Sequence, residues 1–396
     1  MSQVESKETS QVPEQSVDNT PSKEDTKEEE EKPPYYKRVT DDDLYRNSSQ
    51  YRMWSYTADY LREKRSETCQ RATEVVNKKL EEFVNMHKDD LTQEDMEILK
   101  VKASPLTMEE ELKLINFYSK KVQVIAQHLN LPTEVVATSI TFFRRFYLEN
   151  SVLEYDPKNL VHTTIFLACK SENYFISVDS FAKKAKSNRD AILKYEFKLL
   201  ESLKFSLLNH HPYKPLHGFF LDIQTVLHGK VDLKYMGQIY DRCKKRITEA
   251  LLTDVVYLYT PPQITLAILL MEDEQLVRRY LGIKFGKEDT PEESSAEPEK
   301  KNGEAANATS SENSEKDTEK KVPENINFDK LFSVIEECKH TLESSESVST
   351  DEAKRVAAKN YYCQKPDILL QKLKRKKDAA NLEENESPSK KQKLEN

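Results

Sequence analysis

The spacing of the apolar residues limits what this chain can fold into more than any other feature. Over most of the chain they recur three or four positions apart, the spacing of one face of an α-helix. Leu112, Ile115, Val122, Ile125 and Leu129 form one such stripe. No alternating strand pattern of comparable strength occurs, so the spacing predicts an all-α protein.

Helix-start signals divide this pattern into separate helices. A long helix is expected over residues 58–84, and the next starts are marked by the capping box at Thr107, by Pro132, by Asp156-Pro157, by Ser177, and by Ser187 with Asp190. A second set is expected over 212–227, 232–257, the segment "TPPQITLAILLMEDE" and 328–344, and a last helix begins at Ser349 or Thr350. The second set repeats the proline start of the first, which suggests two related helical domains.

The composition indicates which segments can form a packed core and which partners the chain does not suit. Hydrophobic residues make up 37% and charged residues 33% of the 396 residues. Residues 1–34, 287–327 and 378–396 are polar and charged, so we expect them to be disordered. No apolar run approaches the length of a membrane span. The net charge of −8 gives no overall attraction to nucleic acid.

Signals for an enzyme or a metal site are weak. The six glycines form no phosphate-binding loop, and the five cysteines form no C-x-x-C pair. The adjacent His210 and His211 are poor joint metal ligands, and no nucleophile elbow occurs. Glu172 and Glu196 have no indicated cleft between them. We therefore expect no catalytic residue, no metal and no cofactor.

Basic runs near the end of the chain leave two interpretations open. "QKLKRKK" (371–377) and "SPSKKQKLEN" are dense in lysine and arginine. They are either nuclear localisation signals or ordinary polar tail.

Two segments resemble the signature of the cyclin family. "FLACKSE" (166–172) is similar to the cyclin-box helix that ends L-A-x-K-x-E, and "YEFKLLESLKF" places Glu196 nine residues before Phe205, as in the fifth helix of the box. Further blocks, among them "SSQYRMWSY" (48–56) and "LLTDVVYLYTPPQITLAILL", resemble the H type of the family and are closest to its fungal members. The resemblance covers roughly residues 35–286 and 328–376.

The resemblance implies an architecture with definite bounds. It is an all-α fold of two consecutive five-helix cyclin-box repeats, flanked by an N-terminal and a C-terminal helix. The expected parts are a disordered tail (1–34), an N-terminal helical segment (35–104), the first box (105–208), the second box (209–346) with a disordered acidic insertion (287–327), a C-terminal helix (347–377) and a disordered tail (378–396).

The resemblance also implies a site. Lys170 and Glu196, from two neighbouring helices, would hydrogen-bond main-chain groups of a kinase beside its αC helix. Leu167 and Leu200, one helical turn from each, would line the apolar floor of this groove. The alternative is a local salt bridge within the fold. Trp54 is expected to anchor the N-terminal helix by packing, rather than to contact the kinase.

By the same resemblance, the function is regulatory. It implies a subunit that activates a cyclin-dependent kinase of TFIIH, with a MAT-type assembly factor and other TFIIH subunits as partners. Phosphorylation of the RNA polymerase II C-terminal domain, a link to nucleotide excision repair and a nuclear location follow from it, with no sequence-specific nucleic acid or membrane as partner. The rivals are a TFIIB-like DNA-binding factor, which would carry paired cysteines that this chain lacks, and a helical scaffold that activates nothing.

Overall fold

The computed structural model describes residues 41–88, 91–285, 328–344, 348–375 and 377. Every regular element in these ranges is a helix, as the apolar spacing predicts. The residues up to Leu44 form a separate unit, and the packing below concerns Tyr45 onward. The expected disordered parts, residues 1–34, 287–327 and 378–396, lie outside the described residues.

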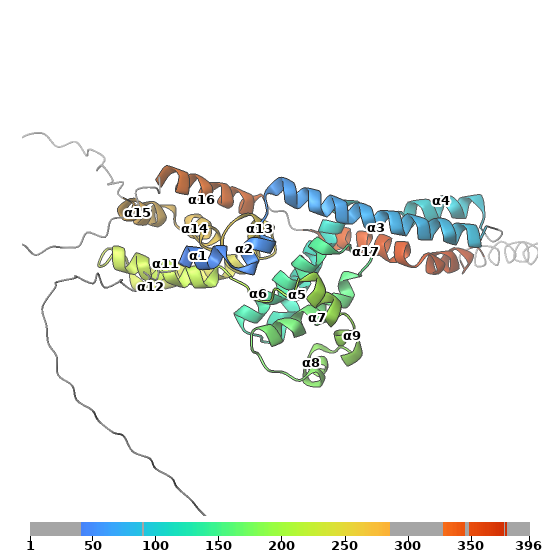
Figure 1. Cartoon of the computed structure of the whole chain (residues 1–396), viewed down its shortest axis with the longest axis horizontal. Coiled ribbons are helices and arrows are strands. Elements are labelled where there is room, and N and C mark those ends of the chain that lie inside the picture. Colours follow the sequence, from blue (N-terminus) through green and yellow to red (C-terminus); the bar gives the residue numbers. More distant parts are fainter. Residues whose placement is uncertain (1–40, 89–90, 286–327, 345–347, 376, 378–396) are drawn as a thin grey trace, which may run out of the picture. The chain divides into compact units, whose positions relative to one another are not determined.

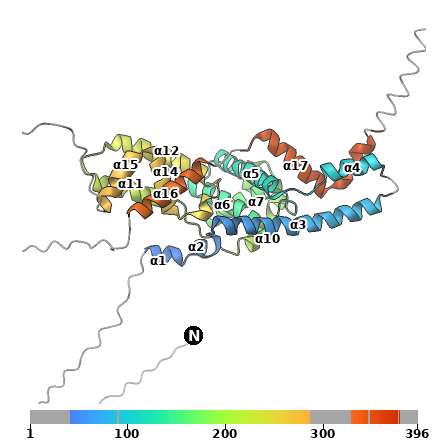
Figure 2. The same ribbon diagram turned by 90° about the horizontal axis from the view of Figure 1, so that it is seen from above.

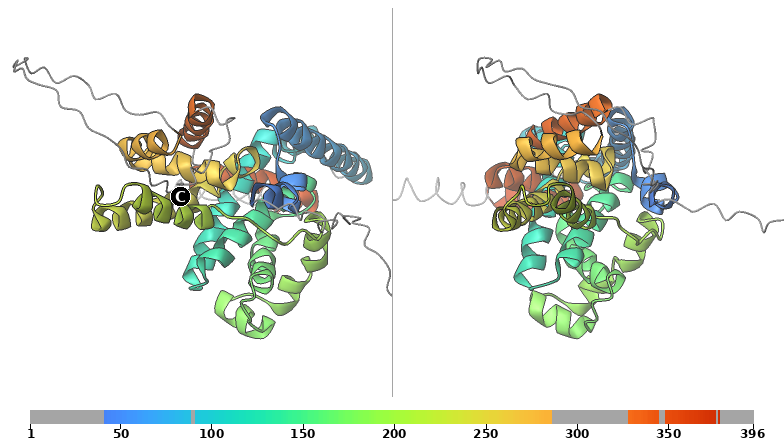
Figure 3. Two further views of the ribbon diagram at one scale, coloured as in Figure 1. Left: turned by 60° about the vertical axis from the view of Figure 1, so that its left-hand side comes forward. Right: turned by 90° about the vertical axis from the view of Figure 1, so that its left-hand side faces the viewer.

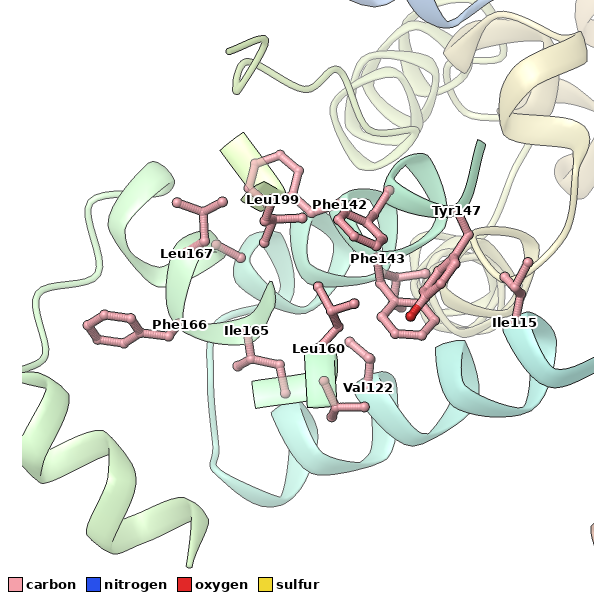
Figure 4. Close-up of a cluster of buried hydrophobic side chains, with 14 of the residues drawn as sticks. Ile115, Val122, Phe142, Phe143, Tyr147, Leu160, Ile165, Phe166, Leu167 and Leu199 are labelled. Atoms are coloured by element: carbon pink, nitrogen blue, oxygen red, sulfur yellow. The ribbon is translucent and has the colours of Figure 1, made fainter. Parts of the chain in front are cut away.

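The first repeat is built around one fully enclosed helix. Its six helices are α5 (Met108–His128), α6 (Thr133–Glu149), α7 (Pro157–Ser171), α8 (Val178–Ala185), α9 (Arg189–Leu193) and α10 (Glu196–Ser202). Helices α5, α6 and α7 pack against one another, and α10 lies on α6 and α7. Phe142, Phe143 and Phe146 of α6 are 0% exposed, and Figure 4 shows the core around them. Burial of each such ring contributes roughly 1.5–3 kcal/mol.

The second repeat is organised in the same way around α14. Its helices are α11 (Tyr213–Val226), α12 (Leu233–Ala250), α13 (Val255–Leu258), α14 (Pro261–Glu272), α15 (Glu274–Lys284) and α16 (Phe328–Glu343). Helix α14 contacts the five others and is apolar on nearly every side, which is why it is buried. Figure 3 shows the green helices of the first repeat and the yellow helices of the second as two groups, each with its own core.

The helices before and after the repeats are α1 (Asp41–Arg46), α2 (Ser49–Trp54), α3 (Ala58–Met86), α4 (Gln93–Lys102) and α17 (Thr350–Gln364), followed by a further helical stretch over 366–375. Of these, α3 and α17 pack on the first repeat. Helix α17 contacts α3, α4 and α5. It lies below α3 in Figure 1, and Figure 2 shows the two helices apart where α17 begins and close together near α4. Phe83 and Leu99 form a small separate core with Leu369 and Leu370.

Several expected helix starts are confirmed by hydrogen bonds. Thr107 and Glu110 form a capping box, and Asp156 caps α7 ahead of Pro157. The hydroxyl of Ser177 accepts from the amide of Ser180, and Ser349 rather than Thr350 caps α17. Each such cap contributes about 1 kcal/mol.

Two expected continuous helices are broken. The helix expected to run from Ser187 through Leu203 is two short helices, α9 and α10, which are separated by a turn at Lys194 and Tyr195. Asn188 caps α9, and no side chain caps α10. The helix expected over 232–257 ends at Ala250, and α13 starts afresh at Val255. The apolar spacing continues across both turns, because turn residues also contact the core. The fifth helix expected in the first repeat is therefore divided into α9 and α10.

Candidate functional site

Lys170 and Glu196 meet at the end of α7 and the start of α10. Lys170 lies in the last turn of α7, and Glu196 is the first residue of α10. Their side chains form an ion pair in which the Lys170 side chain is 46% exposed and the Glu196 side chain 20% exposed. The Lys170 Nζ also lies 5.0 Å from the ring centre of Phe166, one turn earlier. Both charged groups are thus held in place; Lys170 remains half-exposed, whereas Glu196 is mostly covered and its Oε1 is buried.

The chain turns sharply after each of these helices. Asn173 has φ 56°, a left-handed conformation that asparagine tolerates, and the amide of Tyr174 donates to the Cys169 carbonyl at 2.8 Å. After α10, both Lys204 and Phe205 have φ 53°. Left-handed backbone at residues other than glycine costs about 1–3 kcal/mol. These turns end α7 and α10 and leave their terminal side chains exposed.

The two leucines expected at the site differ in exposure. Leu167 is 3% exposed and belongs to the core of the first repeat, where Figure 4 shows it on α7. Leu200 is half-buried and packs against the same core from α10. Leu167 supports the surface from beneath, while Leu200 still presents apolar area.

Exposed aromatic residues flank the pair, and sequence reasoning missed them. Phe175, on the loop after α7, is 92% exposed; Phe197, next to Glu196, is 66% exposed; and Phe205 is 63% exposed. Exposed rings that gather on one face of a protein are typical of a protein interaction site. The signal in the sequence was that Phe197 stands between Glu196 and Lys198, outside the apolar stripe of its helix, whereas Phe175 lies between Tyr174 and Ile176 and had no such signal.

This arrangement suits recognition of a protein rather than catalysis. A lysine supplies donors and a carboxylate supplies acceptors, so together they match both polar groups of a peptide backbone. Cys169 lies close in sequence but is buried, and burial raises the pKa of its thiol to about 11, too high for a nucleophile at neutral pH. Within the described residues no cluster of three metal-ligating side chains occurs, nor any helix long and apolar enough to cross a bilayer.

Trp54 lies at the junction of the N-terminal helices and both repeats. It is 1% exposed and packs with Leu61, Leu148 and Tyr257. Its ring also stacks against the guanidinium of Arg145, whose Cζ lies 4.9 Å from the ring centre. This burial fits the expected packing role.

Each of the two repeats matches the model of a known protein domain. A model of the cyclin N-terminal domain matches residues 102–208, and a model of the cyclin C-terminal domain matches residues 211–343. The chain belongs to the cyclin family. Lys170 and Glu196 both lie within the N-terminal domain of this cyclin.

The relatives of this cyclin include two yeast proteins. It is 62% identical to Cyclin CCL1 of Saccharomyces cerevisiae over 364 residues, which cover 85% of each chain. It is 35% identical to Cyclin mcs2 of Schizosaccharomyces pombe over 243 residues, which cover 61% of this chain and 73% of the relative. This cyclin is therefore of the H type, as its sequence blocks indicated.

Two solved assemblies contain chains similar to this cyclin. One is the yeast TFIIK (Kin28/Ccl1/Tfb3) complex, with 59% identity and a TM-score of 0.55 over 75% of this chain and 100% of that chain. The other is the CAK complex of Chaetomium thermophilum bound to ATP-gamma-S, with 25% identity and a TM-score of 0.63 over 85% of this chain and 95% of that chain.

Proposed function

We propose that this cyclin binds and activates a cyclin-dependent kinase through the surface formed by Lys170, Glu196 and Leu200, with the buried Leu167 supporting it from beneath. It is a regulatory subunit of the TFIIK or CAK type and not itself a kinase. The observation that carries the site is the ion pair of Lys170 and Glu196, in which the Lys170 side chain is 46% exposed and the Glu196 side chain 20% exposed. We add the exposed rings of Phe175 and Phe197 to this surface, which we call the kinase-binding surface.

The mechanism follows from what a kinase requires. Its β3 lysine must pair with the glutamate of its αC helix, and the position of αC decides whether that pair forms. A rigid surface that binds αC only in its active position shifts the kinase population toward activity. A shift from 1:99 to 99:1 requires about 5.5 kcal/mol of differential binding. Burial of the two phenylalanine rings and two charge-assisted hydrogen bonds are of that order.

The wider role rests on the same proposal. The partners are a TFIIH-type cyclin-dependent kinase, a MAT-type assembly factor and other TFIIH subunits, and the assembly phosphorylates the RNA polymerase II C-terminal domain in the nucleus. The expected domain bounds, 105–208 and 209–346 for the two boxes, remain part of this proposal, as does the link to nucleotide excision repair.

A reconstituted kinase assay tests the site. The double variant Lys170→Ala, Glu196→Ala should lower kinase activity at least tenfold at subsaturating cyclin, since two charge-assisted hydrogen bonds of roughly 1.5–3 kcal/mol each are lost. Lys198→Ala is the matched control, because Lys198 lies on the same helix and pairs only locally, with Glu201 at 3.7 Å. Unchanged activity of the double variant at every cyclin concentration would favour the scaffold interpretation.

A further inference from the structure

One buried threonine of the first repeat directs its hydroxyl out of its own helix. In α6, the hydroxyls of Ser139 and Thr141 each donate to the carbonyl four residues earlier, at 2.6 and 3.0 Å. Thr138, which is 0% exposed, donates from Oγ1 to Oε1 of Glu172 at 2.6 Å and pairs with Nε2 of His211 at 2.8 Å. A buried hydroxyl costs free energy unless it is hydrogen-bonded, so these two bonds account for a polar side chain at this position.

The chemistry of the three groups determines the direction of these bonds. A threonine hydroxyl has one proton, and an ionised carboxylate only accepts, so the proton of Thr138 lies toward Glu172. Burial, together with the nearby Arg145, lowers the pKa of His211 to about 3, so its ring is neutral at pH 7 and carries one proton. That proton lies on Nε2, from which it is donated to Thr138. The two bonds therefore form a relay that runs from His211 through Thr138 to Glu172.

The two ends of the relay belong to different repeats. Glu172 is the C-cap of α7, two residues after Lys170, and its amide donates back into that helix at 2.9 Å. His211 lies on the connection between α10 and α11, and the carbonyl of the next residue, Pro212, accepts from the hydroxyl of Thr265 in α14 at 3.0 Å. The enclosed helices of both repeats, α6 and α14, are thus hydrogen-bonded to this connection.

A further hydrogen bond holds the same helix end to the same connection. The hydroxyl of Ser171, the last residue of α7, donates to the Leu207 carbonyl at 3.2 Å. Lys170 therefore stands at a helix end that is fixed at two points to the chain that joins the repeats.

We propose that Thr138 is a positioning residue for kinase activation, whose hydroxyl holds the end of α7, and with it Lys170, in a fixed position relative to the second repeat. The inference rests on the kinase-binding surface proposed above. Because Thr138 is fully buried, it acts through Lys170 and not by contact with the kinase. The second repeat, which contributes no residue to that surface, thereby helps to set its geometry.

Titration of the kinase with variants of the full cyclin tests this role. Thr138→Val keeps the shape of the side chain but breaks the relay, so the dissociation constant for the kinase should rise about fivefold, with unchanged activity at saturating cyclin. Thr138→Ser keeps the hydroxyl and should restore the affinity. Thr141→Val is the matched control, because that hydroxyl donates within α6, and it should bind as the parent does. Unchanged affinity of Thr138→Val, or an equal loss in Thr138→Ser, would overturn the proposal.

A double-mutant cycle separates positioning from a general loss of stability. In a Lys170→Ala background, Thr138→Val should cause no further loss of affinity, because the relay acts through Lys170. A loss of the same size in both backgrounds would show general destabilisation and refute the role of Thr138. Parent-like affinity of Lys170→Ala alone would refute the kinase-binding surface itself, so the two failures are distinguished.

Measurements on the free cyclin test the relay without the kinase. Amide exchange at Glu172 and Tyr174 should be about tenfold faster in Thr138→Val than in the parent or in Thr141→Val. His211→Phe removes the donor at the far end of the relay and should give the same acceleration, which keeps the test valid if Thr138→Val does not fold. The ring nitrogen shifts of His211 in the parent should report a proton on Nε2. Parent-like exchange in both variants, or a proton on Nδ1, would refute the relay.

Discussion

Individual residues of this cyclin carry its main electrostatic features. Lys170 and Glu196 satisfy each other at the surface, which keeps both charged groups positioned at little desolvation cost. Asp254, whose side chain is 28% exposed, and the buried Glu111 are carboxylates with opposite electrostatic surroundings. Asp254 is paired with two arginines, whereas Glu111 accepts from the hydroxyl of Ser151 and has no basic partner among the described residues.

Removal of the Asp254 charge should be strongly destabilising. Asp254→Asn leaves Arg65 and Arg144 without an anion in a buried place, so the free energy of unfolding should fall by about 3–5 kcal/mol at pH 7. Denaturant titration measures this. Asp241→Asn, in the exposed part of α12, is the control and should change the free energy by less than about 0.5 kcal/mol. Equal effects of the two changes would contradict the pairing described above.

Glu111 should make stability depend on pH. Burial raises the pKa of Glu111 to about 7, well above its value in an unfolded chain. Its contribution is therefore fully present below about pH 4.3 and is lost as pH rises through 7. Relative to the parent, Glu111→Gln should gain up to about 3 kcal/mol of stability between pH 5 and pH 8.

Denaturant titrations of both proteins across this pH range measure the gain. Glu109→Gln changes an exposed carboxylate on the same helix and should track the parent. A constant difference between Glu111→Gln and the parent at all pH values would show that Glu111 does not titrate as described.

At the scale of elements, the sequence predicted where several helices start, but it did not predict where α9 and α12 end. Capping residues such as Thr107, Asp156 and Ser177 act on amides within one turn, so their effect is local and visible in the sequence. The breaks at Lys194 and after Ala250 are imposed by packing between distant segments. The apolar spacing continues through both breaks and therefore concealed them.

The difference between local sequence signals and long-range packing also explains which residues of the candidate site the sequence predicted. The resemblance supplied Lys170 and Glu196, and the spacing supplied the helices that carry them. Phe175 and Phe197 were missed because periodicity identifies buried positions, and exposure follows only from the folded chain. The network of Gln50, Arg145 and His210 joins residues up to 160 positions apart, which no local pattern reveals.

The C-terminal helix should behave as part of the first repeat. Val356 and Cys363 of α17 belong to the core of that repeat. The side-chain amides of Asn360 and Gln364 donate to the Val152 carbonyl at 3.3 and 3.0 Å. Val356→Ala should therefore lower the free energy of unfolding by about 1–3 kcal/mol and speed amide exchange in α5. Ala357→Gly, on the same helix, costs only about 1 kcal/mol of helix propensity. Unchanged exchange in α5 after Val356→Ala would show that α17 docks independently.

At the scale of the whole molecule, the two repeats share an architecture but differ in what they present. Both enclose one apolar helix, α6 or α14, yet only the first repeat carries the ion pair and the exposed rings of the kinase-binding surface. Helices α3 and α17 brace this repeat at α5 and α6, while α7 and α10 carry the proposed kinase-binding surface.

Site-specific photo-crosslinking tests the central claim most directly. The full chain with a benzoyl-phenylalanine in place of Phe197 is assembled with its kinase and assembly factor, irradiated, and analysed by mass spectrometry. The account predicts a crosslink to the αC segment of the kinase, and none from the same probe at Leu221, an exposed leucine of the second repeat that is 51% exposed. Crosslinks from Phe197 to the assembly factor alone, or to no partner, would contradict the account.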